Sequence, residues 1–117
     1  MVDDIQWMLG PEPKNLSPVW TQEVLQLFLR ENGEQYSQES ISNLPVPKWG
    51  GNLLLLEGTD ISDPNCLKGL LWATPFMNEI VRVAAFSITS EYQSKGYGRA
   101  AWNHFVDSAI KDGFSKV

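Results

Sequence analysis

The chain reads Phe86-Ser87-Ile88-Thr89-Ser90-Glu91-Tyr92-Gln93-Ser94-Lys95-Gly96-Tyr97-Gly98-Arg99 between its clearest predicted strand and its clearest predicted helix. The strand, Glu79 to Thr89, is apolar on both faces, which is typical of a central strand in a sheet that helices cover on both sides. The helix, Tyr97 to Asp112, is amphipathic, and one half of its wheel carries Ala101, Trp102, Phe105, Val106, Ala109 and Ile110. Gly96 and Gly98 let the backbone turn tightly from this strand into this helix.

The start of this helix is a candidate anion site. The N–H groups of a first helical turn have no acceptor within the helix, and the positive end of the helix dipole lies behind them. Lys95 and Arg99 add positive charge beside them. Two interpretations stay open at this point, a phosphate site or a tight turn without a ligand. The stretch is not a P-loop, because no Gly-Lys-Ser/Thr follows at the required spacing. It is not a dinucleotide-binding fingerprint either, because the third glycine or alanine of that motif is missing.

The rest of the chain predicts a layered domain. Upstream of the junction we expect a strand over 4–9, a helix over 18–32, a shorter helix over 34–41, and strands over 52–57 and 67–74. Ser17 and Pro18 suit the beginning of the longer helix and Gly33 its end, whereas Pro75 is expected to interrupt the last of these strands. A further strand is expected to begin at Phe114. This order predicts an α/β (α+β) fold with a mixed sheet, in a single domain over 1–117.

Composition limits the partners of this domain. A chain of 117 residues fits one domain, and its net charge of −5 argues against a nucleic-acid or anionic-membrane partner, because either needs a basic face. The single cysteine and single histidine exclude a disulfide framework and the common zinc sites, so we expect no metal. The acidic N-terminus, Met1 to Asp4, lacks the basic-then-apolar layout of a signal peptide, and the longest apolar run, Leu53 to Leu56, is too short to span a bilayer. We therefore expect a soluble, cytoplasmic protein.

The junction resembles a known family. Gln93-Ser94-Lys95-Gly96-Tyr97-Gly98 matches the Gln/Arg-x-x-Gly-x-Gly/Ala signature of the GNAT acetyltransferase superfamily, and the run over 86–98 resembles its histone-acetyltransferase branch. The close resemblance covers about Val81 to Gly113, and the upstream elements agree in order. It implies a GNAT-like three-layer fold, with a mixed, mostly antiparallel sheet and helices on both faces. Family members continue past the helix, so the resemblance predicts a C-terminally truncated domain that ends at the start of a fifth strand.

The resemblance also implies an activity and residue roles. The cosubstrate would be acetyl-CoA, whose pyrophosphate would be held by the backbone amides of Gln93, Ser94, Lys95, Gly96, Tyr97, Gly98 and Arg99. The backbone of Phe86 and Ile88 would pair with the pantetheine arm, in a slot opened by a bulge in the strand. The Ile88 amide would then polarise the thioester carbonyl for direct attack by a primary amine of a small molecule or a peptide.

The chain departs from the family where catalysis is concerned. The glutamate that serves many members as the base falls here at Arg82, and an arginine cannot act as a base at neutral pH. Glu79 is the nearest carboxylate, but its odd offset from Arg82 predicts that it lies on the opposite face unless the bulge re-aims it. Two functions therefore stay open, an N-acetyltransferase and a non-catalytic GNAT-like module that binds an acyl-CoA or another chain. The exposed edge of the fourth strand also predicts a homodimer through that edge.

Overall fold

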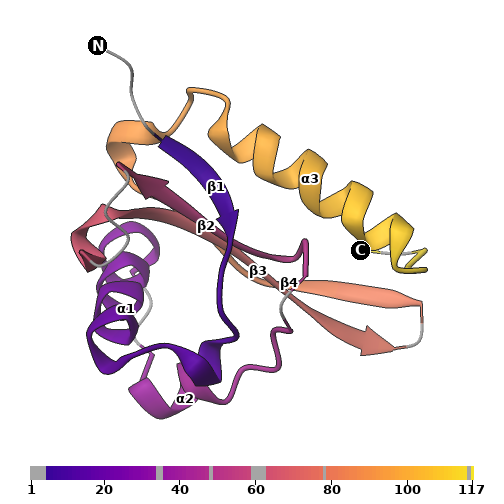
Figure 1. Ribbon diagram of the computed structural model, residues 1–117, viewed down its shortest axis with the longest axis horizontal. Helices are drawn as coiled ribbons and strands as arrows, with labels where there is room; N and C mark the ends of the chain where they lie inside the picture. Colours follow the sequence, from indigo (N-terminus) through magenta and orange to yellow (C-terminus); the bar gives the residue numbers. More distant parts are fainter. Residues whose placement is uncertain (1–4, 34–35, 48, 59–62, 78, 116) are drawn as a thin grey trace.

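The computed structural model of the protein describes residues 5–33, 36–47, 49–58, 63–77, 79–115 and 117. A single antiparallel sheet has the strand order β1 (Ile5–Leu9), β2 (Asn52–Glu57), β3 (Leu67–Met77), β4 (Ile80–Ile88). Helices α1 (Pro18–Asn32) and α2 (Gln38–Ser42) lie against one face of the sheet, and α3 (Tyr97–Lys111) covers the other (Figure 1). The predicted three layers are confirmed. The described strands include no parallel pair, so of the expected mixed sheet they form only the antiparallel part.

The central pair β2–β3 explains why helices cover both faces. Side chains alternate between the two faces of a strand, and in these strands both sets are apolar. Leu54, Leu56, Leu70 and Trp72 belong to the core under α1 and α2. Leu53, Leu71 and Ala73 belong to the core under α3.

The ends of α1 follow the local sequence. The Ser17 hydroxyl accepts a hydrogen bond from the Trp20 N–H at 3.3 Å, and Gly33 closes the helix with a left-handed φ of 67°. The second helix begins later than predicted, because Ser37 provides its N-cap by accepting from the Ser40 N–H at 3.0 Å. It therefore runs from Gln38 to Ser42 instead of over 34–41, and residues 34 and 35 lie outside the described residues.

Pro75 does not interrupt its strand, which corrects the prediction. The Ala73 N–H donates to the Gly51 carbonyl on the β2 side. Backbone N–H groups point alternately to the two sides of a strand, so an N–H at position 75 would also point to the β2 side. β2 pairs with β3 only as far as Trp72, so no acceptor there needs an N–H from Pro75. On its other side β3 continues to pair with β4, with Pro75 opposite Val81.

β4 lies at the end of the described sheet, although its apolar pattern predicted a central position. Both its faces are covered, since Val81 and Phe86 pack with the core under α3 and Ala85 packs with the core under α1. Just before β4 begins, the Ser115 N–H donates to the Glu79 carbonyl at 2.9 Å. Apolar side chains on both faces of a strand indicate that helices cover both faces. They do not indicate whether a further strand pairs with each of its two edges.

Only part of the predicted apolar half of α3 is buried. Ala101, Phe105 and Ala109 are buried, whereas the side chains of Trp102 and Ile110 are 39% and 65% exposed. The buried stripe is therefore narrower than the apolar half of the wheel.

Phe105→Ala should lower the free energy of unfolding by about 3–5 kcal/mol, because a fully buried aromatic ring leaves a cavity when it is truncated. Ile110→Ala on the same helix should change it by no more than about 0.5 kcal/mol. Urea denaturation followed by tryptophan fluorescence measures both values. Equal losses in the two variants would contradict the packing of α3 described above.

Candidate functional site

The loop that joins β4 to α3, residues 89–96 (the β4–α3 loop), has an unusual backbone. Ser94 has a φ of 62° and Gly96 a φ of 89°, both in the left-handed region. Gly96 adopts this conformation freely, whereas at Ser94 it costs about 1–2 kcal/mol. Left-handed residues alternating with right-handed ones turn successive N–H groups toward one side, which is how the chain forms a small anion-binding concavity.

The amide groups from Ser94 to Arg99 have no acceptor in the described part of the chain. The first backbone bond of α3 runs from the Ala100 N–H to the Gly96 carbonyl at 3.1 Å, so all the donors before it point outward. The residues that carry them are exposed or half-buried. Together with the positive end of α3 they form a donor cluster suited to a phosphate group.

Gln93 differs from the residues that follow it. Its N–H already donates to the Ser90 carbonyl at 3.3 Å. Its side-chain amide donates to the Ile88 carbonyl at 2.8 Å. The free donors of the predicted site thus begin at Ser94.

The structure brings three predicted residues into contact at the start of α3. A Cβ added to Gly98 would lie 3.4 Å from Cδ1 of Ile88 and 3.7 Å from Cζ of Phe86. The first turn of α3 therefore rests on these two strand side chains, and the helix donors lie directly beside the end of β4.

The outer edge of β4 next to these donors is open. The Thr89 N–H donates to the Lys68 carbonyl of β3 at 2.8 Å, so by alternation Phe86 and Ile88 direct their N–H groups to the other side. Trp72 pairs with Ala85 and Ala73 with Val83, which leaves Ala84 as the extra residue of a β-bulge. The expected bulge is thus present, and it bends the strand beyond the open edge.

Two residues that the sequence did not identify hold the β4–α3 loop in place. The Trp7 indole N–H donates to the Tyr97 carbonyl at 2.7 Å, which ties the first turn of α3 to β1. The Glu31 carboxylate accepts from the Ser90 hydroxyl at 2.9 Å and from the Ser90 N–H at 3.3 Å. Both are far from the loop in sequence, so no local pattern could have identified them.

Tyr92 stiffens the same loop from the other side. It donates a short hydrogen bond to Glu57 and packs edge-on against Tyr97, with ring centroids 5.9 Å apart. The ammonium group of Lys95 lies 5.6 Å from the centroid of the Tyr92 ring.

The predicted base Glu79 and Arg82, which occupies the usual position of the base, lie away from this loop, whereas Ile88 lies beside it. Arg82 is exposed, and its guanidinium carbon lies 5.1 Å from the centroid of the Phe76 ring. Glu79 is exposed in the turn before β4, about 30 Å of strand length from Ile88 at the usual rise per residue. The structure does not bring Glu79 to the loop, and its role as a base stays a prediction.

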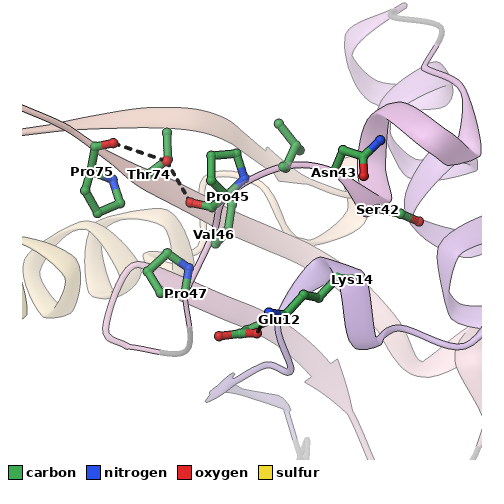
Figure 2. A pocket seen from close by; sticks show the side chains of 10 residues that line it. Glu12, Lys14, Ser42, Asn43, Pro45, Val46, Pro47, Thr74 and Pro75 are labelled. Carbon is green, nitrogen blue, oxygen red and sulfur yellow. Dashed lines mark hydrogen bonds and ion pairs between the residues drawn. The ribbon is translucent and has the colours of Figure 1, made fainter.

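Figure 2 shows a pocket of about 510 Å³ beside Thr74, the residue that pairs with Arg82 in the sheet. It is lined by Glu12, Lys14, Ser42, Asn43, Leu44, Pro45, Val46, Pro47, Thr74 and Pro75. The Thr74 hydroxyl donates to the Pro45 carbonyl at 2.7 Å and fixes one wall, and Lys14 pairs with Glu12 at 3.2 Å on the opposite wall. Thr74 stands opposite Arg82 in the sheet, so the pocket lies on the α2 side of that part of β4.

Metal and membrane sites were predicted to be absent. Among the described residues, no group of three or more His, Cys, Asp or Glu side chains could hold a metal ion. No helix within the described ranges has the length and apolarity that crossing a membrane requires.

Ser94→Gly should raise the free energy of unfolding by about 1 kcal/mol, since glycine adopts the left-handed conformation without strain. Ser94→Val should lower it by at least as much, because a β-branched side chain tolerates that conformation poorly. Chemical denaturation measures both variants. Equal stability of the glycine and valine variants would contradict the left-handed backbone at this position.

Comparison with known proteins supports the fold. No protein-family model matches the chain, and no curated protein does. The structure superimposes on Ard1 from Thermoplasma volcanium with a TM-score of 0.73 and 14% identity, over 95% of this chain and 67% of that one. The ribosomal-protein-S18-alanine N-acetyltransferase from Escherichia coli gives 0.67 and 14%, over 95% and 63%. N-acetylglutamate synthase from Neisseria gonorrhoeae, in complex with coenzyme A and N-acetyl-glutamate, gives 0.60 and 18%, over 95% and 24%.

The chain thus spans 67% and 63% of the length of the first two of these proteins. Similarity at identities this low is a similarity of fold. The 117 residues have the fold of the GNAT acetyltransferases, over the part of that fold which they span.

Proposed function

We propose that the protein binds acetyl-CoA at the start of α3 and transfers its acetyl group to a primary amine. The observation that carries this proposal is the run of amide donors without acceptors from Ser94 to Arg99, beside the open edge of β4. A diphosphate needs such a donor cluster, and an extended amide-containing arm can pair with a free strand edge. The fold shared with a coenzyme A complex, that of N-acetylglutamate synthase, supports the same ligand.

Each part of the site then has a task. The amides from Ser94 to Arg99 bind the pyrophosphate, with the side chains of Lys95 and Arg99 adding positive charge. The backbone of Phe86 and Ile88 pairs with the pantetheine arm along the outer edge of β4. The Ile88 N–H donates to the thioester carbonyl and stabilises the oxyanion that forms when the amine attacks.

The acceptor amine enters from the other half of β4. The pantetheine arm runs from the β4–α3 loop toward the bulge at Ala84, beyond which Arg82 faces the α2 side opposite Thr74. The pocket lined by Thr74, Pro75 and Asn43 opens there, about 20 Å of strand length from Ile88, so we assign it to the distal part of a long acceptor whose amine reaches back to the thioester (Figure 2). Glu79 lies about 30 Å of strand length from Ile88, too far to take the proton of an amine that attacks a thioester there, so in this proposal that proton leaves to solvent.

A second function is favoured by the residue at the usual base position. Arg82 cannot accept a proton there, and the carboxylates next to the β4–α3 loop are already hydrogen-bonded to it. In this alternative the protein binds an acyl-CoA without transferring the acyl group, or pairs the outer edge of β4 with a second copy of itself. The dimer and the ligand would exclude each other, because both use the N–H groups of Phe86 and Ile88.

Gly98→Asp should abolish the binding of acetyl-CoA in calorimetric titration, because it places a carboxylate among the phosphate donors. Gly98→Ala is the matched control, since its Cβ would make only ordinary contacts with Phe86 and Ile88 and should leave a folded protein that still binds. Unchanged binding by the aspartate variant, or no binding by the wild type, would exclude the proposed site.

Asn43→Trp should raise the KM for the amine at least tenfold by filling the pocket, while leaving the affinity for acetyl-CoA unchanged. Asn103→Trp, on the exposed side of α3, should change neither. Acetyl transfer to polyamines, lysine and aminoglycosides gives the readout. Saturable binding of acetyl-CoA without transfer to any of these amines would favour the second function.

A further inference from the structure

We propose that Glu31 is a positioning residue that holds the β4–α3 loop in the conformation that binds the phosphates. We also propose that the Gln93 side chain bonds to the protein's own backbone and does not contact the ligand. The proposal rests on the binding of coenzyme A put forward above. It concerns the last turn of α1, which no sequence pattern connects with the loop.

The Glu31 carboxylate is the hub of a hydrogen-bond cluster. One oxygen, Oε1, accepts from the Ser90 hydroxyl at 2.9 Å and lies 3.5 Å from the Gln93 side-chain nitrogen. The other, Oε2, accepts from the Ser90 N–H and from Nε of Arg30, both at 3.3 Å. The Glu31 side chain is only 8% exposed, so these donors replace most of its water.

The next residue of α1 makes a parallel contact with the end of β4. The Ser87 hydroxyl donates to the side-chain oxygen of Asn32 at 3.3 Å. The last turn of α1 thus holds both the strand and the loop that follows it.

The place of Glu31 is unfavourable for a carboxylate in two respects. It lies in the last turn of α1, where the negative end of the helix dipole disfavours negative charge. It also lies beside a loop whose free amides suit an anion, which it would repel. The contacts with Ser90 and Gln93 offset the unfavourable helix dipole and the repulsion of a bound anion, because hydrogen bonds to a charged group are stronger than neutral ones.

The Gln93 side chain completes the arrangement. It donates to the Ile88 carbonyl at 2.8 Å, a group on the outer edge of β4 that an extended ligand would otherwise meet. With that carbonyl already bonded, the Ile88 N–H is the group left to pair at this end of the strand. Glu31, within reach of the same side-chain nitrogen, sets the direction of the Gln93 amide.

Charge and positioning predict opposite outcomes for Glu31→Gln. If only charge mattered, removing it would tighten the binding of an anion, and more so at low salt. If Glu31 positions the loop, the amide must place an NH₂ group against one of its present donors, and the loop becomes less ordered. Binding then weakens, because ordering the loop has to occur on association.

The experiment is calorimetric titration of coenzyme A into the wild type, Glu31→Gln and Glu23→Gln at low and at high salt. We expect Glu31→Gln to bind about tenfold more weakly at both salt concentrations, the size expected for a lost charged hydrogen bond. Glu23 is the control, because it lies on the same helix and makes no ion pair or side-chain hydrogen bond within the described ranges.

A double-mutant cycle separates positioning from general stability. If Glu31 acts through Ser90, then Ser90→Ala should weaken binding in the wild type and have little further effect in Glu31→Gln. The melting temperatures should not follow these changes in affinity. Equal or tighter binding by Glu31→Gln, or additive losses in the cycle, would overturn the role of Glu31 alone. A wild type that does not bind coenzyme A would overturn the proposed function, and this inference with it.

Discussion

The central strands β2 and β3 are apolar on both faces, and this constraint shapes the rest of the molecule. Leu53 and Leu54 point to opposite sides of the sheet, as do Leu71 and Trp72, so each face must be covered by a helix. Burying these side chains is the largest favourable term in folding, at about 25 cal/mol per Å² of apolar surface. Two cores result, with α1 and α2 over one and α3 over the other. The site follows from them, because the C-terminus of α1 and the N-terminus of α3 then meet at the same end of β4.

At that end the fold leaves backbone N–H donors without an acceptor among the described residues. A buried N–H without an acceptor costs about 1–3 kcal/mol, so unpaired donors are tolerated where solvent reaches them. The amides from Ser94 to Arg99 satisfy this condition, and so does the open edge at Phe86 and Ile88. Their direction is set by surrounding contacts, chiefly Trp7 on the first turn of α3 and Glu31 on the preceding loop. Preorganised donors of this kind bind an anion without first having to be arranged.

The same contacts explain why the carboxylates near the β4–α3 loop are already hydrogen-bonded or ion-paired. Near the loop, Glu31 accepts from Ser90, Glu57 accepts from Tyr92, and Glu91 lies 3.8 Å from Lys68. These carboxylates hold the loop in position. The exposed side chains of Arg82 and Glu79 and the pocket of about 510 Å³ lie at the other half of the strand, beyond the bulge. The loop end of β4 thus has free backbone donors and hydrogen-bonded carboxylates, whereas the exposed Arg82 and Glu79 lie at its other end.

The sequence by itself determined the order of the elements, the caps of α1 and the turn into α3, because these depend on residues close together in the chain. Ser17, Gly33 and the glycines at 96 and 98 carry that information locally. It did not determine that Pro75 continues a strand, that β4 lies at the end of the described sheet, or that Trp7 and Glu31 hold the β4–α3 loop. Each of these depends on which segments lie side by side. The residues next to Trp7 in the sequence do not indicate that its indole N–H donates to the Tyr97 carbonyl. Only tertiary packing brings such groups within hydrogen-bonding distance, so only the tertiary structure decided how the predicted loop is held and where its free donors begin.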